Sequence, residues 1–527
     1  MIRQILREKA ALLGDKPFLC FRDESISFRE MDERSNRAAN LLREIGVRRG
    51  DKVCLMIGNR PEFVELWFGL AKLGAIMVPM EISLGRKSAS YIASHSDATV
   101  FAVEDSAYLA IEEWLRKLPK IRKKIWIGSI GGGPHGFLNF RETVGAFPRT
   151  AWRLPPTDPS DVMSIVYTPG TTGLPKGAMI SHRNYSHAGS LWAEHVVRAD
   201  ARDVFYTTQH LSLVQTQTLS VVGALVSGCR LVLGDGFIAR TFFDAIRRHG
   251  ATVFPYTSSM IESLMKLEPR PDDAANPARL AFGGAADRSM AREFGDRFGI
   301  EMVEGFQLAE CGGMCLANFG EGAKEGAIGR PLPSYEVKVF DEFQEELPTG
   351  LSGEIVLRPT TPESAFLGYY REPDRTAENM ANGWFHTGDR GYVDTEGYFF
   401  FIDRKGDCIR RGREVFPCVE VERIVNGHPN VLESAATGIL SELDDEDVRV
   451  FLVLHPGMDV TPEEFVAWCS GRMPSHLVPR YVEIVRELPK TAIGGIRKHE
   501  LRKRPVRGDG RQDRRRAVTP ANSPFEQ

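Results

Sequence analysis

The segment at residues 167–184, YTPGTTGLPKGAMISHRN, gathers glycine, threonine and lysine residues that together suit an anion. Small residues let backbone N–H groups turn toward one anion, hydroxyls add donors, and a lysine adds charge. The candidate phosphate-binding residues are Thr168, Gly170, Thr171, Thr172, Gly173 and Lys176. The spacing GTTGLPKG is not that of a Walker A loop, so composition predicts phosphate binding without naming the nucleotide.

A second candidate loop lies near the end of the chain, in LPKTAIGGIRKHEL at residues 488–501. Thr491 followed by the pair Gly494 and Gly495 predicts a tight loop that brings the backbone close to a ligand. Neither glycine offers a side chain to that ligand. The next lysine, Lys498, follows three residues after Gly495.

The elements that must position these loops alternate between short β-branched runs and amphipathic stretches through about the first 300 residues. Runs such as KVCLMIGN, TVFAVE and VMSIVYTP predict strands, and TFFDAIRRHG and DRSMAREFGDRFG predict helices between them. This alternation predicts an α/β fold with largely parallel sheets. From about residue 335, SYEVKVFD, GEIVLRP and GYFFFIDR predict a smaller β-rich unit.

After IDRKGD the pattern restarts as a compact α+β module. Its clearest helix follows Thr461, which is the expected N-cap, with Pro462 at the first helical position and Glu464 at the third. We therefore expect an N-terminal domain over residues 1–404 and a C-terminal domain over 405–503. The remainder, 504–527, is rich in arginine and poor in apolar residues, which predicts a disordered basic tail.

Bulk composition excludes several classes of protein. The chain of 527 residues is 42% apolar and 26% charged, so a large core is expected. Its net charge of −3 disfavours nucleic acid as the main partner, and we find no apolar run long enough for a membrane span. Eight scattered cysteines without a CxxC pair argue against a zinc site or a disulfide framework. We expect a cytoplasmic protein in a reducing compartment.

The phosphate loop resembles the signature loop of the adenylate-forming superfamily, which includes acyl-CoA synthetases, and other motifs of that superfamily follow in order over about residues 10–500. The resemblance implies an adenine-side turn at GGAA (Gly283, Gly284, Ala285) and adenine stacking by EGFQLAE (Glu304, Gly305, Phe306, Gln307), which ends in the magnesium ligand Glu310. It implies ribose contacts from Asp389 in GWFHTGD and from Phe401 and Arg404 in FIDRKGD. The C-terminal half is most similar to the crotonobetaine/carnitine-CoA ligase branch.

The resemblance also implies a reaction in two steps. A carboxylate attacks the α-phosphate of Mg-ATP to give acyl-AMP and pyrophosphate; the small domain then rotates, and coenzyme A attacks the acyl carbon as AMP leaves. The first step places charge on phosphoryl and carboxylate oxygens and needs positioned cations and donors. The second needs mainly a held AMP, a path for CoA and an attacking thiol.

This sequence departs from the family where the first step needs help. The family pattern P-x-T-x-x-G-K places Gly495 where a lysine bridges carboxylate and α-phosphate. A second family pattern, Y-G-x-T-E, places Ala309 where a threonine contacts phosphate. Pro169 replaces a common serine in the phosphate loop. We therefore expect a ligase that has lost adenylation and joins a preformed acyl-adenylate to CoA. In these losses the chain is similar to non-adenylating acyl-CoA ligases of diterpenoid antibiotic biosynthesis, which implies a bulky terpenoid acid.

Two further places bear on that prediction. The glycine that opens the CoA tunnel in the family falls at Arg413, beside Gly412, so the side chain of Arg413 either obstructs CoA, turns away or meets a CoA phosphate. The expected hinge, Lys405 and Gly406, contains a glycine that suits a large backbone rotation. The acyl pocket is expected around residues 207–219, with His210 and Gln215 as candidates, and in the residues before GGAA, including PYTSSM at 255–260. The first of these segments is more polar than a fatty-acyl tunnel needs.

Three functions stay open at this point. The first is thioester formation from an acyl-adenylate supplied by a separate adenylating ligase, with Mg²⁺ and ATP bound unproductively if at all. The second is a complete ATP-dependent ligase in which Lys498 or another cation replaces the lost lysine. The third is a non-catalytic protein that binds acyl-AMP or a nucleotide. A monomer or a homodimer is expected in each case.

Overall fold

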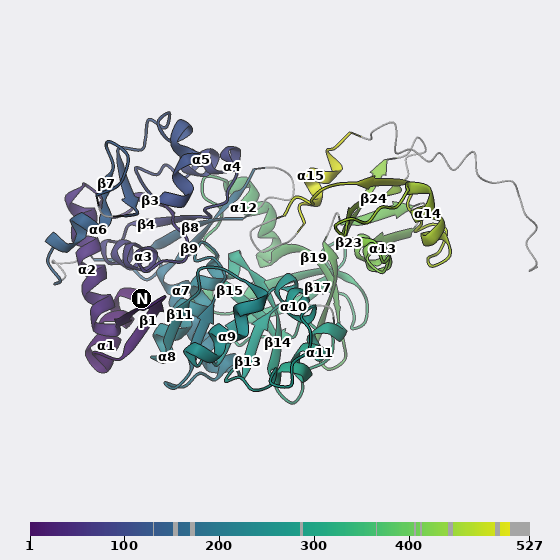
Figure 1. Cartoon of the computed structure of the whole chain (residues 1–527), viewed down its shortest axis with the longest axis horizontal. Coiled ribbons are helices and arrows are strands. Elements are labelled where there is room, and N and C mark those ends of the chain that lie inside the picture. Colours follow the sequence, from purple (N-terminus) through teal and green to yellow (C-terminus); the bar gives the residue numbers. More distant parts are fainter. Residues whose placement is uncertain are drawn as a thin grey trace, which may run out of the picture.

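The computed structural model describes residues 1–129, 131–150, 156–168, 174–284, 288–364, 366–404, 407–411, 414–440, 446–490 and 496–505. Most elements form one large body, and the C-terminal strands and helices form a smaller one at the opposite end from α1 (Figure 1). The prediction of an α/β fold with a large N-terminal part and a small α+β C-terminal part is confirmed.

Two mixed sheets form the framework of the large body, and in both of them the inner strands run parallel. The nine-stranded sheet has the order β16 (Arg330–Pro331), β15 (Gly313–Asn318), β14 (Glu301–Leu308), β13 (Leu280–Gly283), β12 (Val253–Pro255), β10 (Val204–Thr207), β11 (Arg230–Leu233), β1 (Pro17–Phe21), β2 (Glu24–Ser27). The seven-stranded sheet has the order β7 (Leu138–Asn139), β6 (Lys123–Ile127), β5 (Val100–Glu104), β3 (Lys52–Met56), β4 (Ile76–Met80), β8 (Val162–Thr168), β9 (Lys176–Ser181).

Helices cover these sheets because each carries an apolar stripe that is buried against strands; α3 is buried along its whole length. Figure 1 shows α3 beside β3 and β4, and α9 to α11 along the nine-stranded sheet. The helices of the large body are α1 (Ile2–Leu13), α2 (Phe28–Glu44), α3 (Pro61–Leu73), α4 (Arg86–His95), α5 (Asp105–Leu115), α6 (Phe140–Thr143), α7 (His182–Leu191), α8 (Gly223–Ser227), α9 (Ala239–His249), α10 (Ser258–Met265), α11 (Arg288–Phe298) and α12 (Pro373–Asn379).

Shorter helical turns connect the strands. Two of them are π-helical, η2 (Trp192–Val197) and η3 (Thr216–Val222), and π turns inside helices are frequent at functional sites. The others are 3₁₀ turns: η1 (Val144–Ala146), η4 (Ala309–Cys311), η5 (Pro362–Ser364) and η6 (Ala381–Gly383).

The predicted β-rich unit is an antiparallel sheet of four strands, β17 (Tyr335–Phe340), β18 (Gly353–Pro359), β19 (Phe385–Val393) and β20 (Phe399–Arg404). The C-terminal part holds a hairpin and a three-stranded sheet: β21 (Cys408–Arg411), β22 (Glu414–Pro417), β23 (Val431–Leu440), β24 (Glu446–Leu454) and β25 (Tyr481–Ile484). Its helices are α13 (Cys418–Val425), α14 (Pro462–Ser470) and α15 (Lys498–Arg502).

The start of α14 confirms the predicted capping box. The Thr461 hydroxyl accepts from the Glu464 backbone, and the Glu464 carboxylate accepts from the Thr461 backbone. All eight cysteines are unpaired. Within the described residues no helix is long and apolar enough to cross a membrane.

His182 is the first residue of α7, immediately after β9 of the phosphate-loop hairpin, and it is fully buried. Neither ring nitrogen has a hydrogen-bond partner within the described part of the chain. Burial, with Arg3 nearby, lowers the pKa of His182 to about 4 from its ordinary 6.5. The folded protein therefore holds this imidazole neutral.

We predict that the free energy of unfolding falls as the pH drops from about 6.5 to about 4, because the unfolded chain takes up a proton that folded His182 refuses. A difference of about 2.5 pKa units corresponds to roughly 3 kcal/mol, fully lost below pH 4. Denaturant unfolding across this range should show a shallower pH slope in His182→Gln than in the exposed-site control His195→Gln. An equal slope in both variants would contradict the assignment.

Candidate active site

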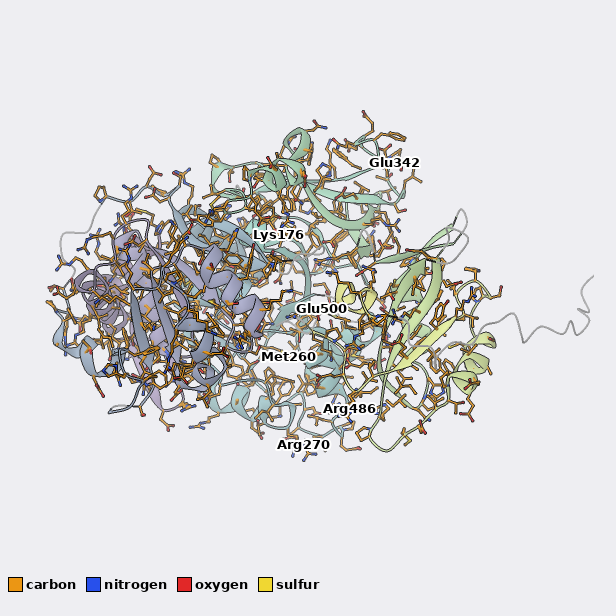
Figure 2. All side chains as sticks on the ribbon, turned by 90° about the horizontal axis from the view of Figure 1, so that it is seen from above. Lys176, Met260, Arg270, Glu342, Arg486 and Glu500 are labelled. Carbon is orange, nitrogen blue, oxygen red and sulfur yellow. The ribbon has the colours of Figure 1, made fainter. Side chains whose placement is uncertain are left out.

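The phosphate-loop segment is held at the end of a β-hairpin. Strands β8 and β9 pair antiparallel, and Thr168 lies opposite Lys176, while Gly170, Thr171, Thr172 and Gly173 lie outside the described residues, as does Pro169. The Lys176 ammonium donates to the Tyr369 hydroxyl at 3.2 Å and lies 4.7 Å from that ring's centroid. Burial lowers the pKa of Lys176, and the charge of Glu310 acts in the opposite direction. Figure 2 labels Lys176, which lies near the centre of the molecule in that view.

Glu310 follows β14 and is buried beside this lysine. The Tyr369 hydroxyl donates to Glu310 Oε1 at 2.7 Å, so one phenol joins the phosphate-side lysine to the predicted metal ligand. The sequence analysis missed Tyr369, and no periodic pattern marks it. The neighbouring Ala309 is 7% exposed and offers no hydroxyl to this cluster.

The residues do not form a preformed metal cage, since no group of three His, Cys, Asp or Glu side chains converges within the described ranges. Mg²⁺ usually binds through one or two carboxylates together with phosphate oxygens and water. Glu310 therefore fits a magnesium ion that arrives on a nucleotide.

The adenine-side turn is built by close backbone approach between neighbouring strands. A Cβ on Gly284 would lie 2.7 Å from the carbonyl oxygen of Gly305, and one on Gly283 would lie 2.5 Å from that of Tyr256. Only glycine allows β12, β13 and β14 to come this close at their carboxyl ends, where ligands of parallel sheets bind. Ala285 lies outside the described residues.

The rest of the predicted adenine segment lies along β14. The hydroxyl of Tyr256, which lies in the PYTSSM segment expected at the acyl pocket, donates to Glu304 at 2.6 Å. Phe306 is 9% exposed and belongs to the main apolar core, and its carbonyl accepts from the Cys315 thiol. Gln307 is half-buried. Base stacking by Phe306 stays a prediction.

The predicted ribose residues meet across β19 and β20. Arg404 Nε donates to Asp389 Oδ1 at 2.8 Å, and Asp389 is 1% exposed. Burial raises the pKa of Asp389, although the Arg404 charge acts against that shift, and Asp389 in turn raises the pKa of Arg404. Phe401 is 41% exposed and lies three residues before Arg404 in β20. The pair is thus a buried carboxylate held by a partly exposed guanidinium.

Glu354 of β18 supports the turn next to the predicted ribose residues. No sequence motif marked this glutamate. Its carboxylate accepts from the Gly388 backbone at 2.9 Å and lies 3.2 Å from His386 Nδ1. The turn before Asp389 is therefore fixed by a neighbouring strand.

The remaining motif positions of the C-terminal part lie outside the described residues: Lys405, Gly406, Gly412, Arg413 and Gly495. The cations that flank residues 491–495 are described, and each has an acidic partner. Lys490 pairs with Glu433 at 2.5 Å, Lys498 with Glu422 at 2.9 Å, and Arg497 with Glu500 at 3.2 Å. The partners of these three cations all belong to the C-terminal part.

The predicted acyl segment follows β10. Asn59, which sequence reasoning missed, clamps it: its amide donates to the Gln209 carbonyl, and its oxygen accepts from the Leu211 backbone, both at 3.0 Å. His210 between them is 37% exposed, with Nε2 at 4.0 Å from Glu81 Oε1. Gln215 is half-buried and immediately precedes the π-helical turn η3.

A separate hollow of about 710 Å³ lies among charged side chains of α2, α3 and α6 and contains none of the predicted site residues. Its groups pair largely with one another; for example, Arg34 lies 2.7 Å from Glu24 and 2.6 Å from Glu30. We interpret it as a charged surface groove whose lining residues form ion pairs with one another.

Known proteins match both parts of the chain. The family model described as AMP-binding enzyme matches residues 6–370, and the model described as AMP-binding enzyme C-terminal domain matches residues 420–494. Crotonobetaine/carnitine–CoA ligases of Citrobacter koseri and Salmonella arizonae are 33% and 32% identical over 512 residues, covering 95% of this chain and 98% of each ligase.

Solved structures agree in fold. The anthranilate CoA ligase AuaEII in complex with anthranoyl-AMP superposes with a TM-score of 0.85 at 27% identity, covering 95% of this chain and 96% of that one. ATP-bound MatB from Rhodopseudomonas palustris gives a TM-score of 0.84 at 23% identity, covering 95% and 98%. At that identity the second likeness concerns the fold alone.

We predict that Gly284→Ala weakens AMP binding by roughly five- to 150-fold, because the added methyl group forces the turn away from Gly305 at a cost of about 1–3 kcal/mol. Titration calorimetry with AMP measures the change. The matched control is Gly236→Ala, where an added Cβ meets nothing within 4 Å. Equal AMP affinity in both variants would remove this turn from the nucleotide site.

Proposed function

Since this chain belongs to the family of AMP-binding enzymes and is an acyl-CoA ligase of the adenylate-forming superfamily, we propose that its main reaction is the second half of that ligation. In this reaction an acyl-adenylate and coenzyme A give an acyl-CoA thioester and AMP. The observation that carries the proposal is the contrast between an assembled nucleoside end and a carboxylate end without its lysine.

The nucleoside end has the groups that AMP recognition needs. Asp389 and Arg404 pair across β19 and β20, and Gly284 lets the turn after β13 lie against the Gly305 carbonyl. A buried carboxylate held by an arginine suits ribose hydroxyls, which can donate to it. These features support binding of AMP or of an acyl-adenylate.

The end of the site that would hold the substrate carboxylate lacks two functional groups, a lysine ammonium and a threonine hydroxyl. The sequence alone shows this, so it does not depend on how the loop is folded. Residues 491–495 read TAIGG, so no cation stands at Gly495, and Ala309 has no hydroxyl. The cations on either side are held by Glu433, Glu422 and Glu500. Loss of one preorganised transition-state donor typically costs about 3–4 kcal/mol, a factor of 10² to 10³ in rate.

The second half-reaction depends less on the lysine and the threonine hydroxyl that are missing at positions 495 and 309. The CoA thiol gives its proton to solvent, its sulfur forms a bond to the acyl carbon, and the acyl C–O bond breaks so that its electron pair leaves with AMP. The Lys176 ammonium, next to Glu310 through Tyr369, supplies positive charge for the phosphate that leaves. Magnesium, when bound at Glu310, neutralises phosphate charge at the same end.

The second candidate is a complete ATP-dependent ligase. The curated relatives are named as whole ligases and match over 95% of this chain, and Lys176 and Glu310 are both retained. The comparisons support this candidate better than the half-reaction, whereas the residues at positions 309 and 495 support the half-reaction.

The identity of the acyl group is also a proposal. The acyl segment presents His210, Gln215 and the nearby Glu81, which favours an oxygenated, bulky acid such as a terpenoid acid over a plain fatty acid. A ligase restricted to the second half-reaction needs a separate adenylating enzyme to supply the acyl-adenylate. We propose such an enzyme as its partner.

We predict that a panel of diterpenoid and aromatic acyl-adenylates with CoA yields thioester and AMP at least 100-fold faster than the free acids with Mg-ATP and CoA. Chromatography of the thioester and a coupled pyrophosphate assay measure the two reactions. Prompt pyrophosphate release from a free acid would establish the complete ligase. AMP binding without thioester from any adenylate would point to a binding protein.

Restoring the two missing groups tests whether their loss is what prevents adenylation. We predict that Gly495→Lys combined with Ala309→Thr raises pyrophosphate release from a free acid at least tenfold, because both lost donors return. The matched control is Gly494→Lys with Ala309→Thr, which adds the same charge one residue away. If the two double variants adenylate equally, position 495 is not the site of the lost lysine.

A further inference from the structure

Tyr369 lies between Lys176 and Glu310 and belongs to none of the predicted motifs. The side chain is 2% exposed, its hydroxyl donates to Glu310 Oε1 at 2.7 Å, and it accepts from Lys176 Nζ at 3.2 Å. The Phe366 ring packs edge-on against it, with centroids 4.9 Å apart. One hydroxyl thus links two groups of opposite charge.

The backbone around Tyr369 is tied to the strand that carries Lys176. Tyr369 forms an isolated antiparallel bridge with Ala178, and the flanking residues exchange hydrogen bonds with β9: Tyr370 donates to Gly177, and Met179 donates to Gly368. The Tyr369 N–H donates to the Thr376 hydroxyl of α12 at 2.9 Å. The phenol is therefore fixed relative to Lys176 from both sides.

The next residue turns its side chain away from this cluster. The Tyr370 hydroxyl donates to Asp97 at 3.0 Å, and its ring packs against His95, with centroids 6.1 Å apart. The two tyrosines share backbone surroundings but differ in what their hydroxyls contact. Tyr370 is therefore a matched reference for Tyr369.

A phenol has one donor hydrogen and an oxygen that accepts. Because the hydrogen points to Glu310, the oxygen lone pairs are left for the Lys176 ammonium, and both hydrogen bonds involve a charged group. The lysine keeps further N–H donors and the glutamate keeps its second oxygen. Each group can then act on a ligand while the phenol stands between them.

We propose that Tyr369 is a positioning residue that holds Lys176 and Glu310 toward one phosphate and keeps them from closing into a direct ion pair. This inference rests on the proposed function, because it takes the bound ligand to carry an AMP phosphate. It assigns Tyr369 no proton transfer and no bond to the substrate.

The test compares AMP with adenosine, which differ in the phosphate alone. In Tyr369→Phe the ring and its packing remain but the hydroxyl is lost, so Lys176 and Glu310 can pair directly. AMP affinity, measured by titration calorimetry with and without Mg²⁺, should fall at least tenfold, and adenosine affinity should change less than twofold. Tyr370→Phe should leave both affinities within twofold of the unsubstituted protein.

Each other outcome contradicts the proposal. An equal loss for AMP and adenosine indicates general damage to the site, and unchanged AMP binding in Tyr369→Phe means that the hydroxyl positions nothing. If the unsubstituted protein binds neither AMP nor adenosine, the nucleotide site itself is wrong, which separates that failure from a failure of Tyr369.

Discussion

The ion pair of Asp389 and Arg404 is the interaction on which the proposed nucleoside end of the site depends. Asp389 is 1% exposed, and a buried carboxylate is stable only when a partner and hydrogen bonds replace water. The Arg404 side chain is 54% exposed, so solvent weakens this pair relative to one that is buried on both sides. Because Arg404 ends β20 just before the chain passes to the C-terminal part, the same pair joins nucleotide recognition to the place where that part begins.

The phosphate end is organised by a different rule, in which opposite charges are kept near each other without direct pairing. Lys176 and Glu310 share one phenol, so their charges remain directed to a third partner. At the proposed nucleoside end the two charged groups, Asp389 and Arg404, bond each other directly. At the proposed phosphate end Lys176 and Glu310 each bond the Tyr369 hydroxyl instead. An acyl-adenylate offers hydroxyls to the first and a single phosphate to the second, which fits both.

The sequence predicted the fold well because parallel strands and amphipathic helices carry strong local patterns. The strands KVCLMIGN and VMSIVYTP became β3 and β8, and Thr461 with Glu464 formed the capping box as expected. Motif positions such as Asp389, Arg404 and Glu310 were recognised by resemblance. Three supporting residues, Tyr369, Asn59 and Glu354, were not recognised. They contact residues far away in sequence, which are Glu310, Leu211 and Gly388 respectively. Long-range side-chain pairs leave no periodic signal, although Asn59 does follow the carboxyl end of a strand, where ligand-site residues gather.

The position of Lys498 bears on whether another cation can replace the one missing at Gly495. Its ammonium lies 2.9 Å from Glu422, and the two side chains are only 11% and 13% exposed. The negative charges of Glu422 and Asp407 raise the pKa of Lys498 against the opposing effect of burial, so the lysine is charged and well held. To reach a ligand it would have to leave Glu422 uncompensated in a mostly buried site, at a cost of about 3–5 kcal/mol. That cost is comparable to the roughly 3–4 kcal/mol that one transition-state donor supplies, so recruiting Lys498 would return little of the lost catalysis.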